Sequence, residues 1–420
     1  MSEWRKMKIS EFAEVIGGGT PSTKVEAYYG GTNPWLTPRD LTNYKFKRIS
    51  RGERNITEYG LKNSSAKLIP KNSILLTSRA PIGYLAIADN EICTNQGFKS
   101  LIVNPDLADY NFVYYLLLSN IDLLKSFGTG TTFAEISGNV VKNIEFDLPD
   151  LPTQKAIAEI LSSLDDKIEL NNQINQNLEA LAQALFKQWF VDFEFPNENG
   201  EPYKSSGGEM IDSELGEIPK GWKIESLSKI ASLEKSSVKP FEKPNEDFFH
   251  YSLPEFDSGK IPSIEKGEAI LSSKYKVISN SILFSKLNPR IPRVWPVINC
   301  KLNSVCSTEF QVIKPEKEKY FSFINSLLNS EEYIKSIQTK VTGTSSSHQR
   351  VNPKDIINHL FPLPEQSIIE LFHSSTFHFF EKVFDHRSEN EKLKTLRDTL
   401  LPKLISGELE VSEASLEPTF

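Results

Sequence analysis

The chain presents the same succession of sequence features twice, once in residues 4–190 and again in residues 222–405. The paired landmarks are Trp4-Arg5-Lys6 with Trp222-Lys223-Ile224, Asn72-Ser73 with Asn280-Ser281, Cys93-Thr94 with Cys306-Ser307, Gly130-Thr131 with Gly343-Thr344, and Leu151–Gln154 with Leu363–Gln366. The separation between partners drifts, as insertions and deletions in the loops of a duplicated domain would cause. Two similar domains present two similar surfaces, which predicts a binding partner that itself has two similar halves.

Composition is compatible with two such domains. A chain of 420 residues with 39% hydrophobic residues can bury two cores of ordinary size, and no stretch approaches the apolar length of a membrane span. Cys93, Cys300 and Cys306 form no CxxC pair, and the N-terminus shows no signal-peptide pattern. We therefore expect a cytoplasmic protein.

The charge is unevenly distributed along the sequence. The whole chain carries a formal charge of -7, yet residues 1–150 carry +1 and residues 221–360 carry +5. The acidic excess lies in the segments 151–220 and 361–420. Residues 36–80 are locally basic, which is compatible either with contacts to phosphates or with an ordinary solvated surface.

Helical periodicity follows each Leu-Pro-x-Gln landmark. Apolar residues recur at steps of three and four, which is typical of a long helix with a coiled-coil-like seam. In the first repeat the expected seam and partner positions are Ile157, Leu161, Leu164, Ile168, Leu178, Leu181, Leu185 and Trp189. In the second they are Phe372, Phe379, Val383, Leu393, Leu396, Leu400 and Leu404, and Ser406-Gly407 is a predicted stop.

Polar residues interrupt both seams at their centres. Asn171 and Asn175 occupy seam positions in the first helix, and His386 and Asn390 do so in the second. Antiparallel pairing would place these polar centres together, and buried polar groups at a seam fix register and orientation. The alternative is that each helix packs on its own domain and turns its polar centre toward water.

The remaining sequence favours an α+β fold. Short apolar runs bounded by Gly, Pro, Asn and Ser predict strands, for example at 74–77, 100–103, 281–284 and 310–313. Each repeat is therefore expected to be a strand-rich domain followed by one long helix, with the two helices paired as an antiparallel spacer.

Several motifs, in this order along nearly the whole chain, resemble the specificity subunits of type I restriction-modification systems. They are Leu76-Thr77-Ser78-Arg79-Ala80-Pro81-Ile82-Gly83, Thr94-Asn95-Gln96-Gly97-Phe98 and Ile218-Pro219-Lys220-Gly221-Trp222. The resemblance implies target recognition domains at 1–150 and 221–362, spacer helices at 151–195 and 363–410, a linker at 196–220 and a tail at 411–420.

The resemblance also implies the partners. Each recognition domain would read one half of a bipartite double-stranded DNA target, and two methyltransferase subunits would dock on the helices and domains. Restriction subunits can join such complexes. The methylated base would be adenine, and S-adenosylmethionine and ATP would bind the partner subunits, so this chain would carry no cofactor.

The candidate DNA-binding residues lie in predicted loops, where Arg and Lys forks, amides and hydroxyls can contact base edges or phosphates. They are Arg39, Thr77, Ser78, Arg79, Asn95, Gln96, Lys99, Thr129, Thr131, Lys286, Arg290, Arg293, Thr344, Ser345, Gln349 and Arg350. The second repeat departs from the family pattern, because Ser285-Lys286-Leu287 aligns with Thr77-Ser78-Arg79 and Pro254-Glu255 with Pro38-Arg39. Such divergence is expected if the two half-sites differ.

No catalytic or metal-binding motif emerges from the sequence. Gly17-Gly18-Gly19-Thr20 lacks the Lys of a phosphate-binding loop, and His373 and His378 miss the spacing of a zinc pair. The sequence leaves two alternative classes of function. One is a nuclease or methyltransferase that acts alone, and the other is a two-domain protein-interaction scaffold without DNA specificity. We expect a non-catalytic specificity subunit with no metal.

Overall fold

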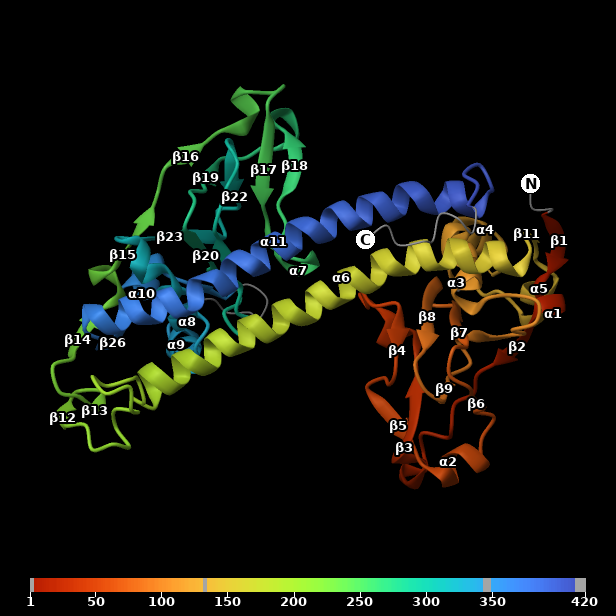
Figure 1. Cartoon of the computed structure of the whole chain (residues 1–420), viewed down its shortest axis with the longest axis horizontal. Helices are drawn as coiled ribbons and strands as arrows, with labels where there is room; N and C mark the ends of the chain where they lie inside the picture. The colour runs from red at the N-terminus through yellow and green to blue at the C-terminus, as the bar shows by residue number, and fades with distance from the viewer. Residues whose placement is uncertain (1–3, 131–133, 343–348, 412–420) are drawn as a thin grey trace. The chain divides into compact units, whose positions relative to one another are not determined.

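The computed structural model describes residues 4–130, 134–342 and 349–411 (Figure 1). It divides the chain into two compact units, one made of Met1–Glu169 with Lys392–Phe420 and the other of Leu170–Glu391. Both divisions fall inside long helices. The first unit and the second unit therefore each contain one strand-rich part together with a portion of both helices.

The first unit has a five-stranded sheet in the order β2-β10-β7-β8-β4, a four-stranded sheet in the order β5-β3-β9-β6, and the pair β1-β11. Its strands are β1 (Arg5–Lys8), β2 (Ala13–Gly17), β3 (Tyr29–Leu36), β4 (Arg48–Ile49), β5 (Arg54–Ile56), β6 (Leu68–Ile69), β7 (Ile74–Ser78), β8 (Ile82–Ala88), β9 (Ile92–Thr94), β10 (Lys99–Val103) and β11 (Glu145–Leu148). Its short helices are α1 (Ile9–Phe12), η1 (Glu26–Tyr28), η2 (Pro38–Leu41), α2 (Glu58–Lys62), α3 (Tyr110–Ser119), α4 (Ile121–Ser126) and α5 (Gly138–Asn143).

The second unit has a four-stranded sheet in the order β15-β23-β20-β21, a five-stranded sheet in the order β16-β19-β22-β17-β18, and three strand pairs, β12-β13, β14-β26 and β24-β25. Its strands are β12 (Met210–Ser213), β13 (Gly216–Pro219), β14 (Lys223–Ser226), β15 (Ala231–Glu234), β16 (Ser237–Val238), β17 (Asp247–Tyr251), β18 (Ser263–Lys266), β19 (Lys274–Lys276), β20 (Ser281–Ser285), β21 (Val294–Val297), β22 (Ser304–Cys306), β23 (Phe310–Pro315), β24 (Val341–Thr342), β25 (Arg350–Val351) and β26 (Leu360–Leu363). Its short helices are η4 (Leu227–Lys229), η5 (Pro240–Glu242), α7 (Leu253–Ser258), η6 (Gly267–Ala269), η7 (Glu318–Tyr320), α8 (Phe321–Leu328), α9 (Glu331–Gln338) and α10 (Pro353–Ile357).

The two units repeat one strand topology. The antiparallel order β2-β10-β7-β8 recurs as β15-β23-β20-β21. In the other sheet of each unit, one strand has a parallel and an antiparallel neighbour. In the first unit β3 pairs parallel with β9 and antiparallel with β5, and in the second β17 pairs parallel with β22 and antiparallel with β18. The terminal pairs β1-β11 and β14-β26 also correspond. The repetition of sequence landmarks therefore reflects repetition of the fold.

Hydrogen bonds across the parallel strands correct two of the sequence pairings. The amide of Asn95 donates to Leu36 O, and the amide of Ser307 donates to Tyr251 O, so these residues are equivalent in the two units. Thr94, rather than Cys93, therefore corresponds to Cys306. By the same register, Asp40 corresponds to Glu255 and Arg39 to Pro254. The sequence alignment was one residue out at both places because short loops contain few identities.

Each unit packs its antiparallel sheet against helices. In the first unit, Ile74 and Leu76 of β7 share a core with Phe112 and Tyr115 of α3. In the second, Phe284 of β20 shares a core with Tyr333 and neighbouring aromatic residues. Burying one such side chain contributes roughly 1.5–3 kcal/mol, so these sheet faces hold the domains together.

Two long helices complete the fold: α6 (Leu151–Phe186), which continues through a π-helical turn, η3 (Lys187–Val191), and α11 (Gln366–Ile405). Asp150 caps α6 by accepting from the Thr153 amide at 2.9 Å, and the Thr153 bonds lower the pKa of the Asp150 carboxyl. After α11, Gly407 adopts a φ of +74°, the left-handed conformation common at helix ends. The predicted α+β class, with two strand-rich domains and two long helices, is confirmed.

Candidate nucleic-acid interface and helix seam

The hairpin between β7 and β8 carries the motif Thr77-Ser78-Arg79, which we predicted on a loop surface. Thr77 and Ser78 are instead fully buried. The Thr77 hydroxyl donates to Pro81 O at 2.7 Å and accepts from the Tyr84 amide at 2.8 Å, and the Ser78 hydroxyl donates to Gly97 O. Their position at the end of a core strand explains the correction. The Thr77 hydroxyl holds the β7–β8 turn, the Ser78 hydroxyl holds Gly97 between β9 and β10, and only Arg79 reaches the surface.

Arg79 belongs to a charge cluster at the base of the first Gly-Thr loop. The Glu135 carboxylate lies 3.5 Å from an Arg79 guanidinium nitrogen and 3.5 Å from Lys99 Nζ. Thr129 and Glu135 exchange two backbone hydrogen bonds, at 3.1 and 3.0 Å, which close the loop at this point. One carboxylate therefore holds two of the predicted DNA-binding cations.

The Asn95-Gln96 turn joins β9 to β10. Asn95 Oδ1 accepts from the Gly97 amide at 2.8 Å, so its side chain stabilises the turn. Gln96 is exposed, and its Oε1 accepts from the Thr20 hydroxyl. Of these two amides, Gln96 is the one placed to present a side-chain NH₂ group to a partner.

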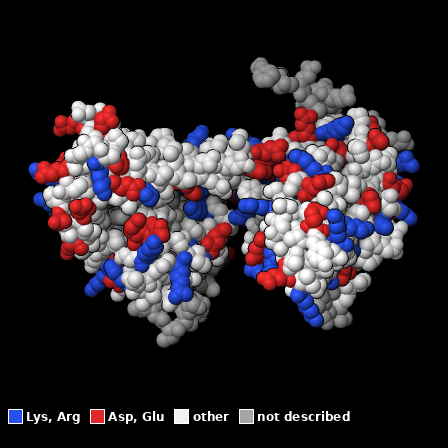
Figure 2. All heavy atoms as spheres, turned by 90° about the horizontal axis from the view of Figure 1, so that it is seen from below, with Lys and Arg blue, Asp and Glu red and all other residues white. Residues whose placement is uncertain are grey.

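The basic segment 36–80 is only partly a surface feature. Lys47 is buried and pairs with Asp166 at 2.9 Å, and Arg48 donates to Asn72 and to the Tyr110 hydroxyl. Arg39, in η2, is exposed and forms no ion pair with a described residue. Other exposed cations in the same stretch are Lys45, Arg51, Arg54, Lys62, Lys67 and Lys71. Figure 2 shows basic and acidic side chains interspersed on the visible face.

The second unit has a charge cluster at the equivalent place. Arg350 forms an ion pair with Glu309 at 2.8 Å, with its Nε donating to the same carboxylate, and this hydrogen bonding lowers the pKa of Glu309. The Lys286 amide donates to Glu309 O at 2.8 Å. Burial lowers the pKa of the Lys286 ammonium group, and the Glu309 charge opposes that shift. Again one carboxylate lies among predicted DNA-binding cations.

Backbone pairing shows that the two clusters are topologically equivalent. Arg79 pairs with Glu135 in the first unit as Leu287 pairs with Arg350 in the second. Ser78 N donates to Gly97 O as Lys286 N donates to Glu309 O. The glutamate of the first cluster, Glu135, therefore lies at the position equivalent to Arg350. The glutamate of the second, Glu309, lies at the position equivalent to Gly97. Sequence inspection missed both acids because no local motif contains them.

Of the remaining candidates in the second unit, some are exposed without an ion pair and others already bond to neighbouring residues. Arg290 is exposed and forms no ion pair with a described residue. Arg293 instead makes two hydrogen bonds of 2.8 Å to Asp257, which raise its pKa. The Gln349 carbonyl accepts from the Asn288 amide at 2.8 Å. Thr131, Thr344 and Ser345 lie outside the described residues.

Most of the apolar residues predicted for the helix seam are buried or partly buried, and two are exposed. Ile157, Leu161, Ile168, Trp189, Phe372, Val383 and Leu404 are buried, and Leu164, Leu178, Leu185, Phe379, Leu393 and Leu400 are partly buried. Leu181 and Leu396 are 46% and 47% exposed, so neither lies on the seam. Ala182 and Leu401 are buried nearby instead. Both misplacements come from the drift of a 3.6-residue helix relative to a seven-residue repeat.

The polar centres of α6 and α11 face each other within the second unit. The Asn171 amide donates to Asn390 Oδ1 at 2.9 Å, and Asn175 Oδ1 lies 2.9 Å from His386 Nδ1. Partner numbers rise along α6 as they fall along α11, so the pairing is antiparallel. These side chains are almost fully buried, which rules out the alternative that they face water. The amide–amide bonds fix the register of the two helices.

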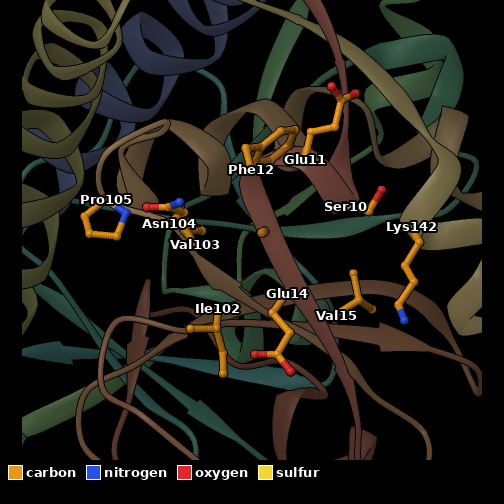
Figure 3. A pocket seen from close by; sticks show the side chains of 11 residues that line it. Ser10, Glu11, Phe12, Glu14, Val15, Ile102, Val103, Asn104, Pro105 and Lys142 are labelled. Carbon is orange, nitrogen blue, oxygen red and sulfur yellow. The ribbon is translucent and has the colours of Figure 1, made fainter.

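A cavity of about 600 Å³ in the first unit lies apart from all these candidates (Figure 3). Ser10, Glu11 and Phe12 of α1, Glu14 of β2 and Lys142 of α5 lie around it. None of the predicted DNA-binding residues lines it. Within the described residues no cluster of His, Cys, Asp or Glu could hold a metal ion, and no helix is long and apolar enough to cross a membrane.

The two units share one strand topology and differ at equivalent loop positions, and each contains a portion of both long helices. Residues 1–180 match the family described as the type I restriction modification DNA specificity domain. The specificity subunit of the type I restriction enzyme MjaIX of Methanocaldococcus jannaschii is 36% identical over 434 aligned residues, with 98% of this chain and 94% of the relative covered. The chain belongs to the family of type I restriction-modification specificity subunits.

Further similarities extend along the whole chain. The specificity subunit of the type I restriction enzyme HindI of Haemophilus influenzae is 24% identical, over 97% of this chain and 100% of the relative. The crystal structure of the type I restriction-modification S subunit from M. genitalium has a TM-score of 0.59 at 16% identity and covers 96% of both chains. At that identity the crystal structure shows a shared fold.

Proposed function

We propose that the two strand-rich domains, 1–150 and 221–362, each read one half of a bipartite duplex DNA target. The repeated topology with different side chains at equivalent loop positions carries this proposal. Arg79 in one unit is replaced by Leu287 in the other, and Arg39 by Pro254. Domains that share a scaffold and differ at their loops would bind DNA in the same manner while reading different base pairs.

The candidates that remain divide into two proposed roles. Arg39, Gln96 and Arg290 present exposed side chains that suit base edges in the major groove. The cations beside the Gly-Thr loops, namely Arg79, Lys99, Lys286 and Arg350, suit the phosphate backbone. Thr77, Ser78 and Arg293 would act indirectly, by holding the shape of these loops.

The long helices, within 151–195 and 363–410, are the proposed spacer and the docking surface for two methyltransferase subunits. Both helices carry exposed leucines, although residues between them pack into the seam. The exposed leucines are Leu170, Leu181, Leu371 and Leu396. Exposed leucines on an otherwise polar helix face fit a protein partner. The segment 196–220 would link the domains.

In this proposal the chain supplies specificity and no catalysis. Adenine methylation would be performed by the partner subunits, which would bind S-adenosylmethionine, and restriction subunits that bind ATP would complete a nuclease. The complex would work in the cytoplasm, where its DNA substrate lies. The charge of -7 fits a chain that shares its phosphate contacts with partner subunits.

A domain exchange tests the assignment. Replacing residues 1–150 with the equivalent segment of another specificity subunit should change one half of the methylated motif, as mapped by sequencing modified adenines in cells that carry the complete system. A motif that changes in both halves, or in neither, contradicts the domain assignment. If methyltransferase subunits associate with the chain but no duplex is bound with sequence preference, a protein-interaction scaffold is the better description.

A further inference from the structure

The two loop-base charge clusters share an arrangement that the proposed function does not require. Each places one glutamate in ion pairs beside a Gly-Thr loop: Glu135 with Arg79 and Lys99, and Glu309 with Arg350. In the second cluster the Lys286 backbone amide also donates to Glu309 O. The glutamates come from non-equivalent positions, 135 in the loop and 309 before β23. The same local charge pattern therefore arises in two different ways.

These glutamates reduce the affinity of the cations for any other anion. A carboxylate and a phosphate group both accept paired hydrogen bonds from a guanidinium group, so they compete for the same donors. Arg350 already makes hydrogen bonds of 3.1 and 2.8 Å to the Glu309 carboxylate, and Lys99 is largely buried beside Glu135. A DNA phosphate that approached either cluster would meet a carboxylate already in its place.

We propose that Glu135 and Glu309 act as phosphate surrogates, which occupy the loop-base cations until a phosphate group of bound DNA displaces them. This inference rests on the proposed DNA-binding function and concerns the regulation of the same surface. Displacement reduces the free energy gained from every duplex by a similar amount. Non-specific DNA, which gains little from base contacts, then binds weakly, whereas a target sequence still gains enough to displace the carboxylates.

The geometry distinguishes the two units. In the first, Glu135 lies 3.5 Å from both cations, and Arg79 is 34% exposed. In the second, Arg350 is 47% exposed but holds Glu309 in a fork with a shortest distance of 2.8 Å. Because this pairing is shorter and uses two guanidinium nitrogens, removal of the Glu309 carboxylate is expected to have the larger effect on DNA affinity.

The test uses the full-length chain with its co-expressed methyltransferase subunits and a 30-base-pair duplex without the target, titrated by fluorescence anisotropy between 50 and 300 mM salt. Glu135→Gln and Glu309→Gln should each increase the affinity for this duplex, by up to about eightfold at 0.1 M salt, because one more phosphate contact becomes available. The slope of log affinity against log salt should steepen by about one for each substitution. A duplex that carries the target should gain affinity by a similar factor, so that the ratio of the two affinities stays unchanged while non-target binding becomes stronger.

Controls separate this mechanism from a change in net charge or in folding. Glu145→Gln, at an exposed position of β11, removes the same charge away from the clusters and should leave affinity and slope unchanged. Glu135→Asp and Glu309→Asp keep the charge but shorten the side chain, so they should raise affinity less than the Gln variants do and leave the slope unchanged. Because the Asp variants disturb the fold least, they decide the question if a Gln variant does not fold.

Unchanged or weaker binding of the non-target duplex by the folded Gln variants, or unchanged binding by the Asp variants where Gln variants do not fold, overturns the inference. In that case the glutamates only stabilise the loop base. A wild-type complex that binds neither duplex contradicts the proposed function itself. The two failures are thus distinguished within one experiment.

Discussion

At the scale of single residues, hydrogen-bonding partners decide whether a polar side chain in a loop motif is available for binding. Thr77 and Thr129 are both hydroxyl residues beside predicted DNA-binding loops. Thr77 is fully buried with two hydrogen bonds, whereas Thr129 is exposed. The sequence gives no reason to separate them, because the partners of Thr77 come from the turn that follows it.

Thr77→Val is expected to destabilise the protein by about 1–3 kcal/mol, because the Tyr84 amide and the Pro81 carbonyl lose the buried Thr77 hydroxyl as their partner. Urea denaturation followed by circular dichroism measures the effect. Thr129→Val is the matched control and should change stability by less than about 0.5 kcal/mol. Equal effects of the two substitutions would contradict the structural role given to Thr77.

His359 predicts a pH dependence of stability. Burial, helped by the nearby Lys340 charge, lowers its pKa to about 4, and its Nδ1 lies 3.2 Å from the Ser336 hydroxyl. The unfolded chain, with an ordinary His pKa of about 6.5, therefore binds a proton that the folded chain does not. The contribution of the uncharged His359 side chain to the free energy of unfolding is fully present above about pH 6.5. It is lost as the pH falls toward 4, by up to about 1.4 kcal/mol per pH unit.

Urea midpoints measured at intervals between pH 7 and pH 5 test this expectation. His359→Gln should flatten the decline relative to the wild type, because the titrating group is removed. His378→Gln, at an exposed position of α11, is the control and should keep the wild-type slope. An unchanged slope in the His359 variant would mean that other groups cause the decline.

At the scale of elements, the two long helices combine apolar packing with a polar centre. The periodic leucines predict that a seam exists, but they leave several alignments of the helices possible. The bonds of Asn171 to Asn390 and of His386 to Asn175 select one antiparallel register.

A double-mutant cycle on the polar centre tests that role. Asn171→Leu should cost about 1–3 kcal/mol in stability, because Asn390 Oδ1 remains buried and loses its donor. Adding Asn390→Leu should recover part of the loss, since an apolar pair can replace a buried polar pair. Chemical denaturation of the four proteins gives the coupling energy, expected between about 0.5 and 3 kcal/mol. Strictly additive effects would show that the two side chains do not interact.

Two leucines on α11 provide a matched test of the seam. Leu404 is 1% exposed and Leu396 is 47% exposed, although both occupied seam positions in the sequence pattern. Leu404→Ala should destabilise the protein by about 2–5 kcal/mol, and Leu396→Ala by less than about 0.5 kcal/mol. Thermal and urea denaturation measure both. Losses of similar size for the two substitutions would restore the original seam prediction.

At the scale of the whole molecule, the first unit is completed by a segment from a distant part of the chain, whereas the second is one continuous stretch. The first core contains Leu401, Leu404 and Ile405 from the end of α11. Arg397 of the same segment donates to Asp165 at 2.6 Å, and Asp165 also accepts from the Tyr115 hydroxyl. The first unit is therefore not a contiguous stretch of sequence.

A chain that ends at Glu391 tests this interdependence. The first unit should lose stability, because Leu404 and its neighbours leave the core, whereas the second unit, which spans 170–391, should keep its own. Hydrogen–deuterium exchange should therefore become faster in α3 and stay unchanged in α8. A synthetic peptide of residues 392–411, added in trans, should restore protection of α3. Undiminished protection in the truncated chain would contradict the shared-core description.

Sequence by itself determined the features that depend on local pattern. Alternating apolar residues and turn residues specified the strands, period-3.6 apolar residues specified the two long helices, and the duplicated landmarks specified two similar folds. The family resemblance followed from the same motifs. Even the facing of the polar centres could be foreseen, because antiparallel pairing of two helices brings their midpoints together.

Only the tertiary structure decided which candidates are available and how they are paired. Arg293 is held by Asp257, 36 positions away, and Glu135 and Glu309 hold the loop cations although neither belongs to a recognised motif. It also showed that Asp40, not Arg39, corresponds to Glu255. Burial and ion pairing depend on neighbours that are distant in sequence, and a pattern of residue types does not contain that information.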